Sequence, residues 1–170
     1  MSTATPPRLS WGVRPAAHED VPAVVEAVQE LLRELGGTPS PTGAMQAAAR
    51  ALLDDPYAGA LLVMEAGGAV ADAEDNRGIV GVLGASWQTA IHAAGRYALI
   101  QDLWVHPLWR GKAIGRELLS ALFDLAHELG VTRAEVGLPP ARFAGLPATE
   151  AFYLDNGFTP VGARMRRVLP

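Results

Sequence analysis

The stretch LWVHPLWRGKAIGRELL, residues 103–119, places the end of a strand, a glycine-containing turn and the start of a helix next to one another. The mostly apolar run at 97–105 predicts a buried strand that ends at His106 and Pro107. After the turn, apolar residues recur at helical spacing until Gly130, a residue typical of helix ends. The expected buried face consists of Ile114, Leu118, Leu122, Leu125, Ala126 and Leu129.

The turn between this strand and this helix is suited to binding an anion. A helix N-terminus has backbone N–H groups without intrahelical partners and carries about half a positive charge. Gly111, Ala113 and Gly115 are small at alternating positions, so their side chains would not block a diphosphate, while Ile114 anchors the turn in the core. Cationic side chains lie beside them. These are Arg110, Lys112 and Arg116.

Two common phosphate-binding motifs do not fit the turn. A P-loop requires Gly-Lys followed by Ser or Thr, whereas Lys112 is followed by Ala113. A dinucleotide fingerprint has more glycines and opens the first strand–helix–strand unit of a chain, whereas this turn comes late. A nucleoside triphosphate and a dinucleotide are therefore disfavoured as ligands.

The remaining elements are predicted from apolar periodicity and from glycine and proline signals. The expected order is strand, helix, helix, strand, strand, strand, helix, strand, helix, strand. The strands are expected at 9–14, 60–65, 79–87, 97–105, 134–138 and 158–168, and the helices at 21–35, 43–53, 114–129 and 149–156. A loop is expected at 139–147. This alternation predicts an α/β fold.

Length and composition indicate one domain. The chain has 170 residues, of which 49% are hydrophobic, enough for one well-buried core. We expect a disordered tail at 1–8 and a single domain at 9–170. The N-terminus shows no basic segment followed by an apolar run, and no apolar stretch is long enough to span a bilayer, so a cytoplasmic protein is expected.

Charge and residue usage exclude several function classes. The net charge is −4 with acids and bases interleaved, which disfavours nucleic acid as a partner. The absence of cysteine excludes thiolate chemistry. The acidic residues of loop 72–78 lack the spacing of a calcium loop, and the four histidines lack ligand spacing, so no metal is expected. No Gly-x-Ser-x-Gly motif of a hydrolase is present.

Residues 103–119 resemble the acetyl-CoA-binding motif of the GCN5-related N-acetyltransferase (GNAT) family, Arg/Gln-x-x-Gly/Ala-x-Gly/Ala. A second block, AFYLDNGF at 151–158, resembles the C-terminal signature of that family. The two motifs occur in the family's order and at its separation. The resemblance implies the acyl-CoA N-acyltransferase (GNAT) fold, a mixed, mostly antiparallel sheet flanked by helices.

The resemblance also implies which residues contact acetyl-CoA, the acyl donor. The backbone amides between Arg110 and Arg116 would receive the diphosphate, and the pantetheine arm would run beside the end of the strand like an added strand. The Val105 N–H is implied as the donor to the oxyanion. The implied donor-binding set is Leu103, Trp104, Val105, Arg110, Gly111, Lys112, Ala113, Ile114, Gly115, Arg116 and Tyr153.

Transfer of an acetyl group to an amine needs a proton acceptor for the amine and a proton donor for the leaving thiolate. Asp102 is the candidate base or acceptor-binding group, and a carboxylate satisfied by backbone N–H groups is the alternative. Glu65 and Glu150 are reserves. Tyr153 is the candidate acid, with a buried structural tyrosine as the alternative. Leu146 replaces the asparagine that often contacts the cofactor in the family.

The resulting hypothesis is direct acetyl transfer from acetyl-CoA to a primary amine of a small molecule or peptide. A non-catalytic acyl-CoA-binding module is the alternative. The identity of the amine, the use of other acyl groups and the choice among Asp102, Glu65 and water as base stay open. Edge strands of such sheets often pair, so a homodimer is a further option, without nucleic acid or membrane as partner.

Overall fold

The computed structural model describes residues 11–66 and 78–169. The expected disordered tail at 1–8, the first two residues of the strand expected at 9–14 and the acidic loop residues at 72–76 lie outside the described residues.

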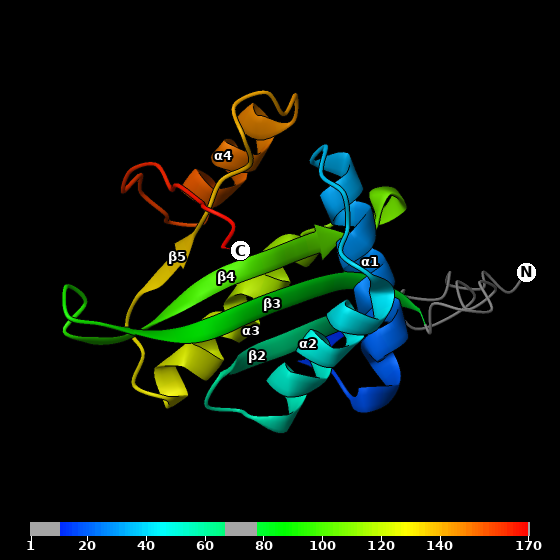
Figure 1. Ribbon diagram of the computed structural model, residues 1–170, viewed down its shortest axis with the longest axis horizontal. Coiled ribbons are helices and arrows are strands. Elements are labelled where there is room, and N and C mark those ends of the chain that lie inside the picture. The colour runs from blue at the N-terminus through cyan, green and yellow to red at the C-terminus, as the bar shows by residue number, and fades with distance from the viewer. Residues whose placement is uncertain (1–10, 67–77, 170) are drawn as a thin grey trace, which may run out of the picture.

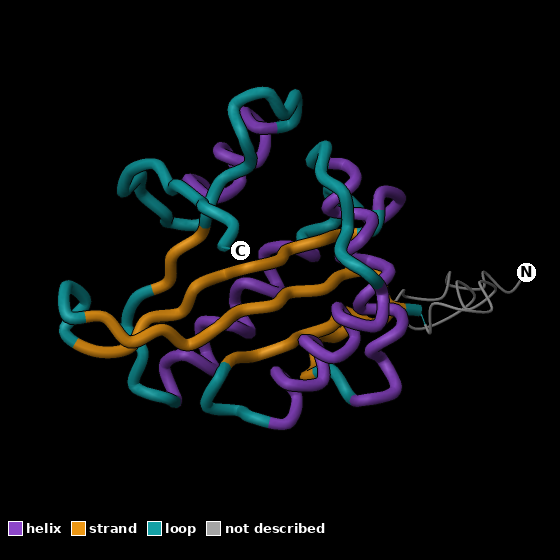
Figure 2. Tube along the Cα trace, in the orientation of Figure 1, coloured by secondary structure: helices purple, strands orange, loops and turns teal. Residues whose placement is uncertain are grey.

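The described strands form one mixed sheet in the order β1-β2-β3-β4-β5 (Figures 1 and 2). The first four are antiparallel neighbours, and β5 runs parallel to β4. The mixed, mostly antiparallel sheet expected from the sequence is therefore confirmed. The strands are β1 (Trp11–Pro15), β2 (Gly59–Ala66), β3 (Ile79–Ala90), β4 (Gly95–Val105) and β5 (Ala134–Val136).

Helices cover both faces of the sheet. The helix α1 (Val21–Glu34) and the helix α2 (Thr42–Asp54) lie across one face, in front of the sheet in Figure 1, and α3 (Ile114–Glu128) lies behind it. The helix α4 (Leu146–Asp155) follows β5. Two apolar clusters result: one on the α3 side, which also includes residues of α4, and one under α1 and α2.

A glycine on β3 lets α3 approach the sheet closely. A Cβ at Gly81 would lie 2.8 Å from Cγ2 of Ile114 and 2.9 Å from Cδ1 of Leu118, closer than side chains pack. Ile114 and Leu118 are almost fully buried and belong to the first turns of α3. The absence of a side chain at Gly81 therefore sets how near the beginning of α3 lies to the sheet.

The strand β4 contains a β-bulge next to the candidate base. Gly84 of β3 pairs with Asp102 and Ala85 pairs with Ile100, which leaves Gln101 as the extra residue. A bulge changes which side chains face each side of a sheet. Ala98 and Ile100 accordingly face the α3 cluster before the bulge, whereas Leu103 and Val105 do so after it.

The structure corrects the prediction for the C-terminal quarter of the chain. The strand expected at 158–168 is not formed, because Pro160 lacks an N–H and Gly162 has a φ of 119°, which together interrupt extended pairing. The strand expected at 134–138 ends at Val136, where it leaves β4. The helix expected from residue 149 begins at Leu146, because a proline such as Pro147 is tolerated in a first helical turn. The loop expected at 139–147 is therefore shifted to 137–145.

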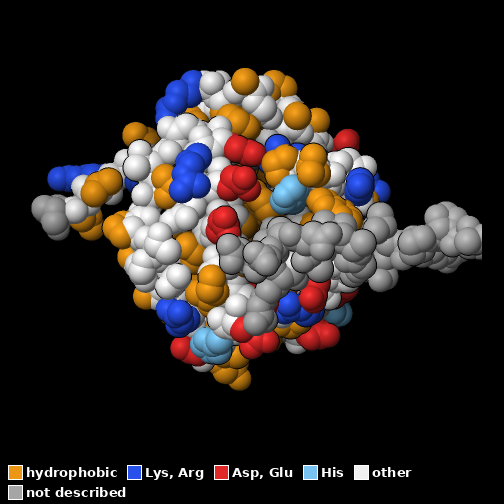
Figure 3. Space-filling model, turned by 90° about the vertical axis from the view of Figure 1, so that its right-hand side faces the viewer, with side chains coloured by type: hydrophobic (Ala, Val, Ile, Leu, Met, Phe, Trp, Pro, Cys, Tyr) orange, Lys and Arg blue, Asp and Glu red, His pale blue; other side chains and the backbone are white. Residues whose placement is uncertain are grey.

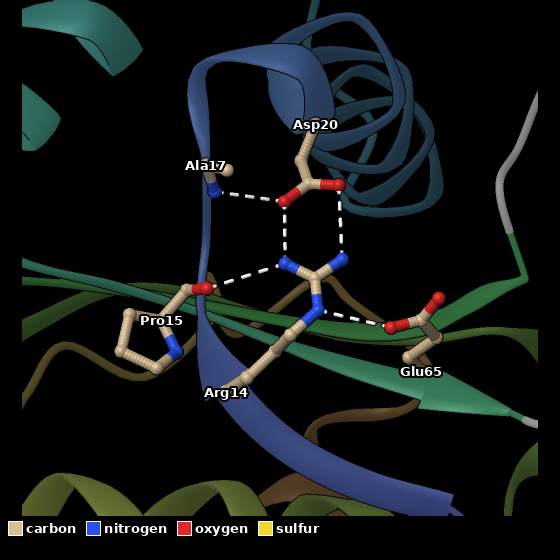
Figure 4. A network of polar contacts seen from close by, with 5 residues as sticks. All are labelled: Arg14, Pro15, Ala17, Asp20 and Glu65. Atoms are coloured by element: carbon tan, nitrogen blue, oxygen red, sulfur yellow. Dashed lines mark hydrogen bonds and ion pairs between the residues drawn. The ribbon is translucent and has the colours of Figure 1, made fainter.

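A polar network fixes the entry to α1 (Figure 4). Asp20 is fully buried, and its carboxylate accepts hydrogen bonds from Arg14 Nη1 at 2.6 Å and Nη2 at 3.1 Å. The Ala17 N–H also donates to Asp20, at 2.8 Å. Glu65 of β2 accepts from Arg14 Nε at 2.9 Å, so Arg14 joins two strands to the helix start. The hydrogen bond to Asp20, together with that to Glu65, raises the pKa of Arg14.

None of the described helices has the length and apolar character needed to cross a membrane.

Candidate active site

The turn before α3 has the backbone conformation of an anion-binding loop. Gly111 and Ala113 are both left-handed, with φ of 76° and 63°, and Ala113 is the N-cap of α3. An alanine with positive φ is uncommon, and such residues cluster at functional sites. Glu117 is the first residue of the helix with a bonded N–H, which donates to the Ala113 carbonyl at 3.0 Å. Within the described residues, the N–H groups from Gly111 to Arg116 have no protein acceptor.

The turn requires small residues for a different physical reason at each position. A Cβ at Gly111 would meet nothing within 4 Å, so its glycine serves the positive φ and the open approach to the backbone. A Cβ at Gly115 would lie 3.0 Å from Cζ of Phe152, so this glycine lets α4 pack against the first turn of α3. Packing as well as ligand access thus explains the pattern read from the sequence.

The three cations beside the turn are not equivalent. The Arg110 Nη2 donates to both carboxylate oxygens of Glu34, at 2.7 and 2.9 Å, and its Nε donates to the Val105 carbonyl at 3.1 Å. Lys112 Nζ lies 4.7 Å from the centre of the Trp109 ring. Arg116 is exposed and, in the part of the chain that the structure describes, forms no ion pair.

Glu34 is a site residue that the sequence analysis missed. It belongs to the last turn of α1, on the opposite face of the sheet, yet it contacts the turn before α3 through Arg110. The pair therefore ties α1 on one face of the sheet to the turn before α3 on the other. A sequence separation of 76 between the partners leaves no local signal for this contact in the sequence.

The end of β4 has a free main-chain edge. The strand β5 pairs with β4 only from Ala98 to Ile100 and then diverges, as Figure 1 shows. The His106 N–H donates to the Val80 carbonyl of the β3 segment at 2.9 Å. Because successive strand N–H groups point to opposite sides, the Val105 N–H points away from β3, toward the opening between β4 and β5.

The structure divides the predicted site residues between two faces of the sheet. Leu103, Val105, Ile114 and Tyr153 belong to the apolar cluster on the α3 side. Trp104 belongs to the cluster under α1 and α2, so its side chain lies on the other face of the sheet from these residues. The Trp104 indole nitrogen is buried without a partner among the described residues.

Tyr153 lies at the centre of an aromatic group. Its side chain is 7% exposed, and its ring makes edge contacts with Phe152 and Phe158 at centroid distances of 5.1 and 5.2 Å. Burial raises the pKa of Tyr153 to about 12. The hydroxyl has no hydrogen-bond partner within the described parts of the chain. A protonated phenol without a structural partner is able to serve as a proton donor.

Asp102 lies on the sheet face of α1 and α2. Its Oδ2 is 3.5 Å from the position that a Cβ would take at Gly84, beside Leu61 of the apolar cluster on that face. Burial raises the pKa of Asp102, and across residues 11–66 and 78–169 the carboxylate has no hydrogen bond or ion pair. The alternative of a carboxylate satisfied by backbone N–H groups therefore has no support in the structure.

The two reserve carboxylates lie elsewhere. Glu65 is bonded to Arg14. Across the sheet, Asp102 pairs with Gly84 of β3, and Gly84 pairs with Leu61 of β2. Glu65 lies four residues beyond Leu61 on β2. At about 3.3 Å per residue, this offset separates Glu65 from Asp102 along the strands by about 13 Å.

Glu150 lines an open cleft of ≈1590 Å³ between β5, α4 and the segment after α4. Tyr153 lines the same cleft, as do Tyr97 and Leu99 of β4. The cleft therefore reaches from the candidate acid on α4 to the strand that carries the candidate base.

Comparisons with known proteins agree with this geometry. The model of the acetyltransferase (GNAT) family matches residues 25–158. The solved structure of the aminoglycoside N-acetyltransferase AAC(6')-Iy in complex with CoA has a TM-score of 0.77 and 12% identity, with 98% of this chain and 99% of that chain covered. No curated protein matches the chain.

Two further solved structures share the fold at low identity. A predicted acetyltransferase with acetyl-CoA from Clostridium acetobutylicum has a TM-score of 0.72 and 16% identity, covering 94% of this chain and 96% of its own. Glucosamine-6-phosphate N-acetyltransferase from Arabidopsis thaliana has a TM-score of 0.69 and 14% identity, covering 95% and 99%. At these identities the likeness establishes the fold and not the substrate.

Proposed function

Because the chain belongs to the acetyltransferase (GNAT) family, we propose that it transfers an acetyl group directly from acetyl-CoA to a primary amine of a small molecule or peptide. The observation that carries this proposal is the run of unbonded N–H groups from Gly111 to Arg116 beside the free main-chain edge of β4. A diphosphate needs N–H donors such as those of the turn, and a pantetheine amide needs the main-chain donors and acceptors of a free strand edge.

The donor side of the site is assigned to residues on the α3 side of the sheet. The diphosphate accepts hydrogen bonds from the turn N–H groups, and Arg116 is the cation free to approach it. The pantetheine arm lies along Leu103 to Val105, in the opening that β5 leaves. Arg110, which Glu34 already neutralises, orients the turn and does not act as a free phosphate ligand.

The proposed reaction needs no covalent enzyme intermediate. Asp102 accepts a proton from the ammonium form of the acceptor, directly or through water, and the neutral amine nitrogen then attacks the acetyl carbonyl carbon to form a C–N bond. The second proton of that nitrogen passes to water as the amide forms. The Val105 N–H stabilises the negative charge that develops on the carbonyl oxygen. The C–S bond then breaks, and Tyr153 gives its proton to the leaving thiolate. The raised pKa of Asp102 makes that carboxylate a better base than an exposed aspartate.

The charge distribution supports a cationic acceptor. Asp102 is a carboxylate without a partner among the described residues. On the face shown in Figure 3, acidic side chains gather while arginine and lysine side chains are scattered singly. An amine that is protonated at neutral pH is attracted by such a surface.

Calorimetry with acetyl-CoA, followed by an assay of free CoA released with a panel of amines, tests the proposal. We expect heat of binding with acetyl-CoA and amine-dependent release of the thiol. Binding without release for any amine would favour the non-catalytic acyl-CoA-binding module, and no heat with acetyl-CoA or CoA would refute the proposed donor site.

A further inference from the structure

A group of polar side chains lies on the sheet face opposite to α3, next to Asp102. On β3, Ala85 and Trp87 face the α3 cluster, so Ser86 and Gln88 point to the other face. The group consists of Ser86, Gln88, Gln101 and Asp102, and we refer to it as the polar stripe. None of its members belongs to either apolar cluster.

The bulge in β4 assembles this stripe. Gln101 and Asp102 are consecutive and would point to opposite faces in a regular strand. Instead, Gln101 Nε2 donates to Ser86 Oγ at 3.0 Å, and the Asp102 carboxylate lies over Gly84 on the same face. The extra residue therefore brings an amide and a carboxylate side by side on one surface.

The amides of the stripe are held by one hydroxyl. Ser86 Oγ accepts from Gln101 Nε2 and from Gln88 Nε2, the latter at 2.9 Å. These bonds use one N–H of each amide, and neither amide oxygen has a donor among the residues that the structure describes. The stripe is a preorganised set of unfilled acceptor positions beside an unpaired carboxylate.

The stripe is continuous with the cleft described above. Ser86 pairs with Leu99 and Gln88 pairs with Tyr97, and both β4 residues line the cleft. In Figure 1, no helix lies in front of this part of β3 and β4, because α1 and α2 cross the sheet nearer the end of β4. A molecule in the cleft can therefore reach the stripe from its open side.

We propose that the polar stripe selects the acceptor and that the acceptor is a primary amine carrying a hydroxyl group near the amine. This inference rests on the proposed function and names the substrate class of the same site. Asp102 receives the amine, and the amide oxygen of Gln101, the residue next to Asp102, accepts a hydrogen bond from the neighbouring hydroxyl. The stripe contains no cation that would favour an acceptor carboxylate or phosphate.

A matched pair of acceptors tests the inference. Turnover of 2-aminocyclohexanol is compared with that of cyclohexylamine, which has the same ring and amine but lacks the hydroxyl. The ratio of their kcat/KM values is measured in the wild type and in Ser86→Ala and Gln101→Leu variants. Comparing ratios between variants cancels the difference in basicity between the two amines.

We expect each variant to lower the ratio about fivefold to tenfold, because one hydrogen bond to the hydroxyl is lost or misdirected. Thr89→Ala is the matched control, since Thr89 is exposed on β3 and its register places it on the α3 face. It should leave the ratio unchanged. Melting temperature and acetyl-CoA binding show that each variant is folded and keeps its donor site.

The outcomes separate this inference from the proposed function. Equal ratios in the wild type and both variants would overturn the inference while acetyl transfer stands. Acetyl-CoA binding with neither cyclohexyl amine acetylated, or faster turnover of a dipeptide amide than of 2-aminocyclohexanol, would also overturn it. Failure of acetyl-CoA to bind would remove the proposed function and the inference with it.

Discussion

Replacing Gly81 by alanine tests whether the closeness of α3 to the sheet controls the donor site. The new Cβ would lie 2.8 Å from Ile114, 2.9 Å from Leu118 and 3.2 Å from Met64 Cβ. Carbon atoms pack at about 3.5 to 4.0 Å, so the beginning of α3 must move by about 0.7 to 1 Å. Overpacking of this kind destabilises a core by roughly 1 to 3 kcal/mol.

Gly84→Ala is the matched control on the same strand. Its Cβ would have Asp102 Oδ2 as the nearest atom, at 3.5 Å, so nothing has to move. Both substitutions restrict the unfolded chain similarly, so that contribution cancels in the comparison. For a domain of this size each kcal/mol shifts the melting temperature by about 2 to 4 °C. We expect Gly81→Ala to melt about 2 to 12 °C below Gly84→Ala.

The same displacement should weaken donor binding. The N–H groups from Gly111 to Arg116 move with α3, and one lost hydrogen bond to a charged group is worth about 1.5 to 3 kcal/mol. Calorimetry should therefore show acetyl-CoA binding about 10 to 100 times more weakly to Gly81→Ala than to Gly84→Ala. Equal melting temperatures would refute the packing argument, and a destabilised variant with unchanged affinity would refute its link to the turn.

Three further substitutions test the assigned roles. Asp102→Asn should lower kcat/KM for amines about 100-fold in the thiol-release assay. Burial raises the pKa of Asp102, so the charged carboxylate opposes folding. Asp102→Asn should therefore also raise the melting temperature at pH 7. It should not do so below about pH 3.9, where the carboxyl is protonated in both the folded and the unfolded state. Tyr153→Phe should reduce kcat about 100-fold or more with unchanged acetyl-CoA affinity. In the wild type, Tyr153 has a pKa of about 12 and stays protonated below pH 10, so its ionisation should cause no loss of rate in that range. Arg116→Gln should weaken acetyl-CoA binding about twofold to fivefold at low salt and less at high salt, because salt screens the contact between an exposed charge and a phosphate. An equal loss of affinity at low and high salt would contradict this assignment.

The parts of the fold that depend on local pattern were predicted from the sequence. The stripe of apolar residues in α3 and the apolar runs of β2 to β4 appear in the structure as a helix and buried strands, with ends shifted by a few residues. The turn before α3 was also predicted, because a glycine and small residues lie directly between an apolar strand and an apolar helical stripe. The positive φ of Ala113 was not, since alanine rarely adopts that conformation.

Features that depend on distant partners could not be predicted in the same way. The segment at 158–168 has the composition of a strand, but a strand forms only where a neighbouring edge accepts its hydrogen bonds. Pro160 and Gly162 indicate that this segment does not pair as a strand, and a prediction from apolar periodicity alone does not take them into account.

The surroundings of Asp102 were predicted only in part. Asp102 stands out in the sequence as an acid inside an apolar strand, whereas its neighbours in the polar stripe come from two strands and depend on the bulge. The consecutive polar pair of Gln101 and Asp102 was the one available signal for that bulge, since regular alternation would place one of them in the core.

The single extra residue in β4 also changes which side chains of the strand face α3. Before it, even-numbered side chains of this strand face α3, and after it odd-numbered ones do. Deleting Gln101 would restore uniform alternation while both halves of the strand keep their present faces, whereas a residue inserted elsewhere in the strand would turn one half of it to the wrong face. The spacing of residues along β4 is therefore as tightly constrained as their composition, and an insertion between Ala98 and Val105 should be tolerated less well than one in the turn at 91–94.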